Sequence, residues 1–549
     1  MRHIEALEKY FKFSSYRPGQ QEIVESILSG KDTLVVMPTG GGKSLCYQVP
    51  AICADGTAII FSPLVALMKD QVDALTAKKI PAAMINSSLK KEQTDSIYLL
   101  AAEGRLKALY IAPERINSRD FSALIQNIRI SFIAVDEAHC VSMWGHDFRP
   151  DYRNIPMIFE TAGNPPVIAL TATATPEVRK DIIRGLRMKH VNEFVRGFDR
   201  PNLSYKVYEP KNKAESLVKI IKKIRTGSII VYSGTRKKVE QNTKLLRDNR
   251  IKADPYHAGL NPILRKSIQE RFISGDTRVI VATNAFGMGI DKPDVRAVIH
   301  TELPGGIESY YQEAGRAGRD GLPADCILLY NYGDEQLQEF FIDSGYPEKK
   351  DISRAYNAIR EKRLLDETAL ANYLDMPLFK LNNILRILER SGDIIKHNAD
   401  RVVVKLYRDG ARIREFLNSQ SDRRFDAAEA ILKSISHEAF YDYTPFDPVK
   451  AAAKYGGGRD DIMKMLEQMS FSGLLEYSIE LNGGMSLKKN AASPEIDHES
   501  IENRKKIALT KLSHIISYAL TPDCKRNYIL KYFDDNEHEG LCGRCTSCR

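Results

Sequence analysis

The sequence lacks the features of secreted and membrane-spanning proteins. It contains no run of about 18 consecutive apolar residues, which is close to the shortest helix that crosses a bilayer. The N-terminal segment MRHIEALEKYFKF has neither the apolar core nor the small-residue cleavage site of a signal peptide. We therefore expect a protein that is neither secreted nor membrane-spanning.

Concentrated charge is also missing. The 80 Lys and Arg residues exceed the 71 Asp and Glu residues by nine, but they form no dense basic run. This balance permits a polyanionic partner without requiring one. Hydrophobic residues make up 43% and charged residues 28% of the chain, so no long stretch has the composition of a disordered segment. A globular chain of this length predicts about three or four domains.

Cysteine is scarce, and half of the eight cysteines lie together near the C-terminus. Four are scattered among apolar neighbours, as expected of buried thiols in a reducing compartment: Cys46, Cys53, Cys140 and Cys326. The remaining four form a cluster in sequence: Cys524, Cys542, Cys545 and Cys548.

The C-terminal cysteines have the spacing of a metal site. Two successive Cys-x-x-Cys steps bring three thiolates to one ion, and Cys524, at the start of the helix-like CKRNYILKYF, supplies a fourth. Such a site suits structural zinc and leaves no open position for metal catalysis. Disulfide bonds are the alternative, which a reducing compartment disfavours.

Short β-branched runs alternate with longer amphipathic stretches between residues 31 and about 335. This alternation predicts an α/β fold with parallel sheets covered by helices. A polar segment without periodicity, residues 194–216, predicts a linker between two such domains, with the boundary near residue 205. The expected strands are DTLVVM, TAIIFS, ALYIA, SFIAVD, VIALTA, SIIVYS, VIVAT, AVIHT and CILLY.

Beyond about residue 345 the pattern becomes mainly helical. Apolar residues recur at helical spacing at Leu381, Ile384, Leu385 and Leu388, and the strand-like pair DIIKH and RVVVKLY follows. This order predicts a helix-turn-helix with a wing. A weaker repeat at 447–488, with Ile462, Met465, Leu466 and Met469 at the same spacing, predicts a second unit of this type. Both apolar stripes are expected to be core.

A glycine-rich segment after the first expected strand, MPTGGGKS (37–44), is typical of a phosphate-binding loop. Its backbone N–H groups would surround a phosphate chain, Lys43 would reach the β and γ phosphates, and the Ser44 hydroxyl would bind Mg²⁺. The alternative is an ordinary glycine-rich turn, since Met37 stands where the general motif has glycine.

The segment VDEAH (135–139) supplies two carboxylates at the end of an apolar strand. Asp136 can hold Mg²⁺ while Glu137 orients or deprotonates the attacking water. By itself such a pair is usually a solvated loop end. Together with the phosphate loop, in this order, it predicts ATP hydrolysis.

At this point the chain resembles the RecQ family of superfamily 2 DNA helicases, over roughly residues 7 to 335. LEKYFKFSSYRPGQ (7–20) looks like the family's adenine-reading motif, which implies that Gln20 bonds the base and Arg17 lies nearby. The expected nucleotide-binding residues are Arg17, Gln20, Thr39, Gly40, Gly41, Gly42, Lys43 and Ser44. Further segments match family motifs: SPLVALMKDQ (62–71), YIAPER (110–115), TATAT (171–175), VYSGTRKKVE (231–240) and ATNAFGMGIDKPDVRAVIH (282–300).

The segment SYYQEAGRAGRDG (309–321) resembles the last motor motif of the family. Gln312, Arg316 and Arg319 would come from the second domain and meet the γ phosphate when the cleft closes, with Arg319 as the arginine finger. The alternative is that both arginines are surface charges on a helix.

The segment CVSMWGHDFRPDYR (140–153) resembles the aromatic-rich loop by which RecQ proteins sense single-stranded DNA. It contains the only tryptophan of the chain, and aromatic faces suit base stacking. The alternative is a buried tryptophan that anchors the loop. The residues expected to contact DNA or couple it to hydrolysis are His139, Trp144, His146, Phe148 and Arg149.

The resemblance implies two RecA-like motor domains. The patterns above add two winged-helix-like units and a zinc module, which stands later in the chain than in the commonest arrangement of the family. The expected domains are 1–205, 206–345, 346–430, 431–510 and 511–549. Basic side chains of the winged regions could contact phosphates, although a solvated surface is equally compatible with each: Lys380, Arg386, Lys396, Arg401 and Lys405.

The expected protein is a DNA helicase that uses ATP, Mg²⁺ and Zn²⁺ and moves 3′ to 5′ on single-stranded and duplex DNA in repair, recombination or replication. This implies a location in the cytoplasm at a bacterial nucleoid, or in a nucleus. A single-strand-binding protein or repair factors are conceivable partners, and a monomer is compatible with the sequence. Two alternatives remain: a translocase or RNA remodeller that does not separate strands, and a non-enzymatic DNA-binding adaptor.

Overall fold

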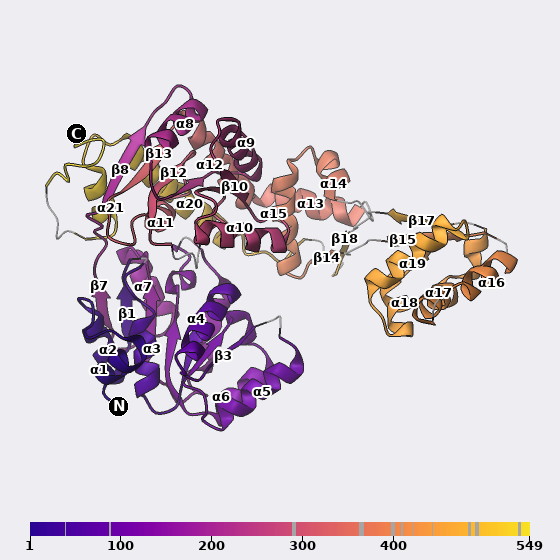
Figure 1. Ribbon diagram of the computed structural model, residues 1–549, viewed down its shortest axis with the longest axis horizontal. Coiled ribbons are helices and arrows are strands. Elements are labelled where there is room, and N and C mark those ends of the chain that lie inside the picture. The colour runs from indigo at the N-terminus through magenta and orange to yellow at the C-terminus, as the bar shows by residue number, and fades with distance from the viewer. Residues whose placement is uncertain are drawn as a thin grey trace. The chain divides into compact units, whose positions relative to one another are not determined.

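The computed structural model describes all residues except 39, 87–88, 146, 288–291, 362–366, 397–400, 408–409, 421, 442, 481–484, 489–492, 536–539 and 549. The chain forms two compact units. The first consists of residues 1–340 and 506–549, and the second of residues 341–505. Figure 1 shows the path of the chain through both. Among the described residues, no helix combines the length and hydrophobicity needed to cross a membrane.

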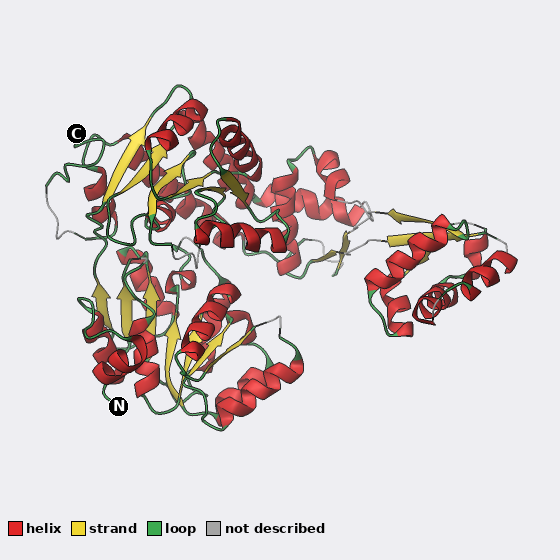
Figure 2. Ribbon diagram, in the orientation of Figure 1, coloured by secondary structure: helices red, strands yellow, loops and turns green. Residues whose placement is uncertain are grey.

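The first unit begins with a seven-stranded parallel sheet, in the order β3-β4-β2-β5-β6-β1-β7. Its central strands are buried from end to end because helices pack on the sheet, as Figure 2 shows. Its strands are β1 (Thr33–Val36), β2 (Thr57–Phe61), β3 (Ala82–Ile85), β4 (Ala108–Ile111), β5 (Ile130–Val135), β6 (Val167–Thr171) and β7 (Asn192–Val195). Its helices are α1 (His3–Ala6), α2 (Gln20–Leu28), α3 (Leu45–Cys53), α4 (Val65–Ala77), α5 (Lys91–Ala102), α6 (Arg119–Asn127) and α7 (Pro176–Gly185).

A second parallel sheet follows, with six strands in the order β10-β11-β9-β12-β13-β8. Its strands are β8 (Leu203–Tyr208), β9 (Ser228–Tyr232), β10 (Ala253–Tyr256), β11 (Val279–Ala282), β12 (Val295–His300) and β13 (Ala324–Leu329). Its helices are α8 (Lys213–Lys223), α9 (Arg236–Asp248), α10 (Pro262–Ser274), α11 (Ile307–Ala314) and α12 (Tyr332–Gly345). The expected α/β class with two parallel sheets is confirmed, and all nine expected strands are present.

The expected linker at 194–216 is shorter than predicted. Strand β8 occupies Leu203–Tyr208 and pairs with β13, so the connection between the two sheets comprises residues 196–202. The strand was missed because it lies at the sheet edge, where buried Leu203 and Tyr205 alternate with partly exposed Ser204 and Lys206. Such alternation dilutes the apolar signal that marks the central strands.

The second unit contains two hydrophobic cores. One core collects residues of α13 (Lys349–Glu361), α14 (Glu367–Leu374) and α15 (Leu378–Arg390), and Leu487, Ile496 and Ile501 pack against it. The other lies within residues 402–475. Its helices are α16 (Gly410–Asn418), α17 (Asp422–Ser434), α18 (Pro448–Tyr455) and α19 (Arg459–Phe471). The two predicted apolar stripes, on α15 and α19, are both buried, which confirms their assignment to the core.

The predicted pairing of DIIKH with RVVVKLY is wrong. Strand β14 (Ile394–Lys396) pairs with β18 (Met485–Leu487), whereas β15 (Arg401–Leu406) pairs with β16 (Thr444–Phe446) and β17 (Leu475–Glu480). The two adjacent strands serve different cores: Ile394 belongs to the first, and Val402, Val404 and Leu406 to the second. Residues 401–480 are therefore inserted, in chain order, between the two strands of the β14–β18 ladder.

Residues 506–549 return to the first unit. Helix α20 (His498–Leu520) leads through a short turn to α21 (Lys525–Tyr532), after which the chain reaches the last three cysteines. The Thr546 N–H donates to the carbonyl of Tyr205 at 3.3 Å, and the Val207 N–H donates to the Thr546 hydroxyl at 3.2 Å. The C-terminal residues thus cover part of the free edge of β8.

Candidate functional site

The glycine-rich segment forms a tight loop between β1 and α3. Gly40 and Gly42 both have φ of +83°, which disfavours any residue with a side chain. A Cβ on Gly42 would also lie 2.4 Å from the amide nitrogen of Gln20. The Lys43 ammonium donates to the carbonyl oxygens of Met37 and Pro38, at 3.0 and 3.2 Å. The loop therefore holds its lysine inside the curve that a phosphate chain would occupy.

Ser44 is the residue before the first turn of α3. A helix N-terminus presents unpaired backbone N–H groups and a partial positive charge, both of which favour a phosphate. The chemistry of this donor set, with Lys43 beside it, fits a nucleotide polyphosphate. Thr39, which was also expected to bind nucleotide, lies outside the described residues.

Two residues of the expected adenine motif contact the loop directly. The Gln20 side chain is buried, and its amide donates to the carbonyls of Gly41 and Gly42 at 3.2 and 3.1 Å. Its carbonyl oxygen accepts the Arg17 backbone N–H, and the Arg17 guanidinium donates to the Gly40 carbonyl at 2.7 Å. The segment that is expected to read the adenine is therefore hydrogen-bonded directly to the glycine-rich loop.

The two carboxylates lie at the carboxyl end of β5. Asp136 continues the ladder, since its N–H donates to the Phe61 carbonyl at 2.9 Å, and its carboxylate accepts the Glu137 N–H at 3.0 Å. Glu137 has a φ of +49°, so the chain turns sharply here and both side chains lie at the edge of the sheet. Both residues line the same cleft as Lys43 and Ser44.

Burial governs the charge of these groups. It raises the pKa of Asp136, which Lys43 opposes, and it raises the pKa of Glu137 to about 7, with the Asp136 charge adding to the effect. Burial likewise lowers the pKa of Lys43, while Glu137 and Asp136 favour its charged form. A carboxyl group with a pKa near neutrality is suited to accept a proton from water.

His139 connects the carboxylates to the TATAT segment. The imidazole is fully buried, with Nδ1 2.9 Å from the Thr171 hydroxyl at the end of β6 and 3.4 Å from the Glu137 carboxylate. The Thr171 hydroxyl also bonds the backbone of Thr173. This places the segment expected to link ATP to the bound strand next to the expected base.

Helix α11 and the loop that follows it, which belong to the domain of the second sheet, bring three residues to the same cleft. Gln312, Arg316 and Arg319 all line it, and Arg319 lies beside Gly40, whose added Cβ would be 3.9 Å from the arginine Cγ. Arg316 is buried, and its charge lowers the pKa of Glu137, against the larger effect of burial. The surface-charge alternative for Arg316 does not hold.

The cleft measures about 570 Å³ and gathers most of the expected nucleotide site. Gly41 does not line it. Residues that were not singled out also line it: Phe13, Ser15, Leu45, Leu67, Asp70 and Gln71. Five of these lie inside the segments 7–20 and 62–71, so the resemblance of those segments was the signal that could have identified them.

The aromatic-rich loop is partly exposed. Trp144 is 41% exposed, so it does not anchor the loop in the interior. Arg149 donates to the Asp147 carboxylate at 2.9 Å and to the Pro63 carbonyl at 2.8 Å, and the Arg153 guanidinium lies over the Phe148 ring. These contacts hold the loop beside the segment 62–71. His146 lies outside the described residues.

The four C-terminal cysteines form one cluster, with all sulfur atoms within 4.8 Å of one another. Sulfurs held 2.3 Å from a tetrahedral zinc ion would be about 3.8 Å apart, so the spacing fits the metal. Burial raises the pKa of Cys545, but hydrogen bonds from the Cys548 thiol and the Lys525 N–H outweigh it and lower that pKa to about 7. A thiolate near neutral pH is the form that binds zinc.

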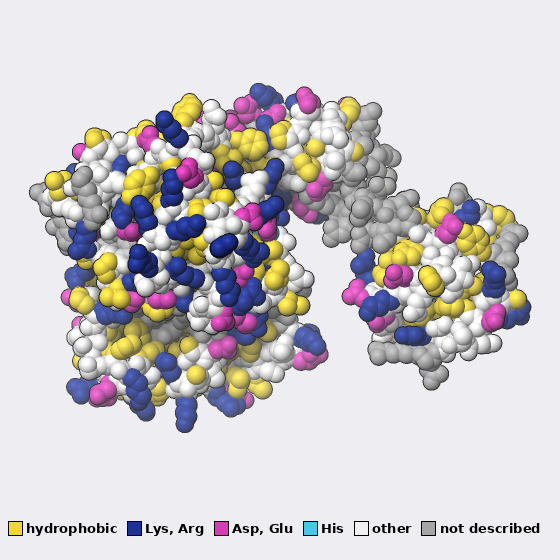
Figure 3. Space-filling view, turned by 45° about the horizontal axis from the view of Figure 1, so that its top comes forward, with side chains coloured by type: hydrophobic (Ala, Val, Ile, Leu, Met, Phe, Trp, Pro, Cys, Tyr) yellow, Lys and Arg dark blue, Asp and Glu magenta, His cyan; other side chains and the backbone are white. Residues whose placement is uncertain are grey.

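The basic residues of the second unit differ in their surroundings. The Lys380 ammonium lies 2.5 Å from the buried Asp351 carboxylate, whereas Arg386 is exposed and Lys405 lies over the Tyr443 ring. The side chains of Lys396 and Arg401 are outside the described part of the chain. On the face of the molecule in Figure 3, Lys and Arg side chains are interspersed with hydrophobic and acidic ones.

Three family models match the chain in agreement with this geometry. One described as DEAD/DEAH box helicase covers residues 17–182, and one described as helicase conserved C-terminal domain covers 212–321. One described as RecQ zinc-binding covers 485–549, which includes the cysteine cluster. The structure therefore agrees with the models on where the two sheets and the cluster lie.

Curated relatives of this chain are named as ATP-dependent DNA helicases. The chain is 46% identical over 346 residues to the ATP-dependent DNA helicase RecQ of Bacillus subtilis and 42% identical over 375 residues to that of Haemophilus influenzae. These alignments cover 63% and 67% of this chain but only 58% and 61% of those proteins. A probable ATP-dependent DNA helicase RecS of Bacillus subtilis is 42% identical, with 67% of this chain and 75% of that protein aligned.

Solved structures share the fold at lower identity. The helicase MrfA bound to DNA and AMPPNP aligns with a TM-score of 0.52 at 20% identity, over 62% of this chain and 53% of that one. The DEAD-box helicase Mss116 bound to single-stranded RNA aligns with a TM-score of 0.50 at 17% identity, over 77% and 94%. At these identities the likeness concerns the fold.

Proposed function

Because this chain belongs to the RecQ family of ATP-dependent DNA helicases, we propose that it couples ATP hydrolysis to 3′-to-5′ movement along single-stranded DNA and to separation of the duplex. The observation that carries the proposal is the single cleft that gathers the phosphate loop, the two carboxylates and two arginines of the second sheet. Single-stranded and duplex DNA are the proposed substrates, at the nucleoid or in a nucleus.

In the proposed reaction the phosphate loop holds the polyphosphate of ATP. The Lys43 ammonium exchanges its bonds to the Met37 and Pro38 carbonyls for bonds to the β and γ phosphates. Ser44 and Asp136 would hold Mg²⁺, which neutralises the developing phosphate charge. Arg17 and Gln20, already bonded to the loop glycines, would read the adenine.

Hydrolysis needs a base and a compensating charge. Glu137 accepts a proton from the attacking water as the water oxygen bonds to the γ phosphorus and the bond to the departing ADP breaks. Arg319 with Arg316 stabilises the negative charge that develops on the γ phosphate and on ADP. The carboxylates follow β5 of the first sheet, whereas the arginines follow α11, which connects two strands of the second sheet. Closing and opening of the cleft would therefore move a DNA strand that is bound across both sheet domains. The loop carrying Trp144 would report the bound strand to the carboxylates through His139, which lies against Glu137.

The test is ATP-dependent unwinding of a duplex with a 3′ single-stranded tail, beside a 5′-tailed duplex and the Lys43→Ala variant. The proposal requires unwinding of the 3′-tailed duplex alone, and its loss in the variant. DNA-stimulated hydrolysis without strand separation would establish a translocase instead. An absence of hydrolysis, with DNA binding retained, would establish an adaptor.

A further inference from the structure

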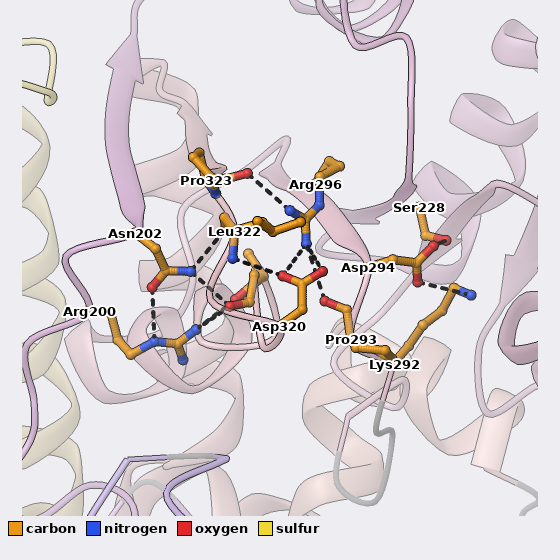
Figure 4. Close-up of polar contacts among 12 residues, drawn as sticks. Arg200, Asn202, Ser228, Lys292, Pro293, Asp294, Arg296, Asp320, Leu322 and Pro323 are labelled. Atoms are coloured by element: carbon orange, nitrogen blue, oxygen red, sulfur yellow. Dashed lines mark hydrogen bonds and ion pairs between the residues drawn. The ribbon is translucent and has the colours of Figure 1, made fainter.

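The loop that carries the two arginines is held by the linker between the motor sheets. The Arg200 guanidinium donates to the carbonyls of Gly315, Ala317 and Gly318, at 3.3, 3.0 and 3.0 Å. Asn202 donates to the carbonyls of Gly318 and Leu322, at 2.8 and 3.0 Å. Figure 4 shows Arg200 and Asn202 on one side of this loop and the Arg296–Asp320 ion pair on the other.

The fit between linker and loop is close. Gly318 has a φ of +55°, and a Cβ there would lie 2.5 Å from the Asn202 amide nitrogen. The Arg200 contacts flank Arg316 on both sides in the sequence and end one residue before Arg319. Because these bonds fix the backbone from which both arginines project, the linker sets where their guanidinium groups lie in the cleft.

The same linker is held on its other side by the C-terminal module, residues 521–549. The Arg526 guanidinium on α21 forms a bidentate pair with Asp199, which is partly buried. Phe533 stacks on the buried Phe198 ring, with centroids 4.6 Å apart and planes 4° apart. The Arg544 guanidinium also donates to the carbonyl of Pro201.

The module also touches the helix that precedes the arginine loop. Phe533 packs on Tyr311 of α11 with a centroid distance of 5.1 Å, and the Tyr311 hydroxyl donates to the Phe198 carbonyl at 2.8 Å. Helix α21 begins directly after Cys524, so the cysteine cluster fixes the N-terminal end of the element that carries Arg526. A continuous path of contacts runs from the cluster through the linker to the arginine loop.

We propose that Arg200, assisted by Asn202, is a positioning residue for ATP hydrolysis, and that the cysteine module acts on hydrolysis by holding this linker through Arg526 and Phe533. The proposal rests on the ATPase function proposed above. Arg200 touches no reacting atom in it. Its effect is on the placement of Arg316 and Arg319, where a displacement of about 1 Å can cost up to a hundredfold in rate.

The experiment measures steady-state ATP hydrolysis at saturating single-stranded DNA, with kcat and KM for ATP determined separately. Arg200→Gln removes the three carbonyl contacts and should lower kcat by about tenfold or more while KM changes less than about twofold. Arg200→Lys, which can reach fewer carbonyls, should lie between. Arg247→Gln is the matched control, since Arg247 pairs with Asp254 in the same sheet domain and is 53% exposed.

A double variant separates positioning from general stability. In an Arg319→Ala background, Arg200→Gln should lower kcat by a clearly smaller factor than it does in the wild type, because one of the two arginines that it positions is already gone. Arg526→Gln should lower kcat about threefold with bound zinc retained, and should add little to Arg200→Gln. Affinity for a fluorescent ATP analogue and the melting temperature should stay near the wild-type values in Arg200→Gln.

Three outcomes would overturn the proposal: a rise in KM at constant kcat, a loss of melting temperature proportional to the loss of activity, or full additivity with Arg319→Ala. Since the readout is hydrolysis alone, a wild-type protein that hydrolyses ATP without unwinding DNA would contradict the helicase function and leave this test intact.

Discussion

The motor sheets and residues 341–505 hold their strands together in different ways. In the sheets every strand has parallel neighbours, and the central ones are buried along their whole length. In residues 341–505 the strands are three to six residues long and antiparallel, and Ile394 pairs with Leu487 across more than 90 positions. A buried parallel strand can therefore be recognised from its own continuous apolar run, whereas the partner of an antiparallel strand cannot be recognised from the local sequence.

The same difference governs where chemistry is placed. The carboxyl ends of parallel strands meet at one edge of a sheet, so the phosphate loop after β1, Asp136 after β5 and Thr171 at the end of β6 converge without further instruction. The antiparallel strands β14 to β18 instead close two separate cores.

The largest expected effect concerns the cysteine module, which belongs to the motor unit although it follows residues 341–505. Cys545→Ser should abolish stoichiometric zinc binding and lower the melting temperature by at least about 5 °C, because structural zinc stabilises the fold that binds it. Hydrogen exchange should rise in β8 and the linker, whose partners lie in the module.

Exchange within residues 402–475 should be unchanged in the same variant, since that core belongs to the other compact unit. Cys53→Ser, a half-buried cysteine outside the cluster, serves as control. An unchanged melting temperature without zinc would show that the cluster does not support the motor.

A smaller effect is expected at Glu137, the buried residue that is proposed as the base. Burial raises the pKa of Glu137 to about 7 from 4.5, so the folded protein binds this proton more tightly than the unfolded one. Its contribution to stability therefore falls as the pH rises from about 4.5 to about 7. Glu137→Gln cannot ionise and should melt above the wild type at pH 8, match it near pH 4.5, and hydrolyse no ATP.

The melting curves are to be measured in Mg²⁺-free buffer without a chelator, so that no Mg²⁺ binds the carboxylates and the cysteine cluster keeps its zinc. Identical pH dependence in wild type and variant would contradict the raised pKa. A residue that destabilises the apo fold but is needed for catalysis is the expected pattern of a functional site.

Much of the motor could be predicted because its residues act within short segments. Lys43 follows its strand by seven positions, and Asp136 follows its own directly, so a local pattern encloses each strand and its functional group. Edge strand β8 was not predicted, because only one of its faces is buried. The hydrogen bond from Gln20 to Gly42 was not predicted either, since no local pattern connects two residues that are 22 positions apart in the sequence.

The second region could be predicted only as far as its helices. The spacing of Leu381 and Ile384 identified a buried helix face, but nothing in IIK or RVVVKL states which strand each one joins. The pairing depends on which core each strand completes, and that is decided by residues about 40 to 90 positions away.

Lys380 is a basic residue of the second unit that lies against a buried carboxylate. Its ammonium neutralises the buried Asp351, so Lys380→Ala should destabilise the second unit by about 1–2 kcal/mol while DNA affinity and its salt dependence stay unchanged. Lys433→Ala, which removes an exposed pair with Glu429, is the control and should change neither. Weaker DNA binding at unchanged stability would instead make Lys380 a phosphate contact.

Removal of the segment between β14 and β18 should change the activity least. Residues 401–480 contain one complete core, and the other core uses residues only from outside this range. Lys396 and Met485 are paired in the ladder, so a two-residue Asn-Gly turn can replace residues 397–484 and join β14 to β18 as a hairpin. The shortened protein should fold, retain its zinc and hydrolyse ATP within about twofold of the full chain, because no packing partner of the remaining core is removed.

Circular dichroism, zinc content and DNA-stimulated hydrolysis of the shortened chain decide the question. A control that replaces 393–487, and so removes the paired strands, should destabilise the core of α13, α14 and α15, because Ile394 and Leu487 are lost from it. Aggregation of both variants would mean that the two cores depend on each other. Folding of the first alone would establish that the long-range β14–β18 ladder, which no local pattern predicts, is the element that closes this region.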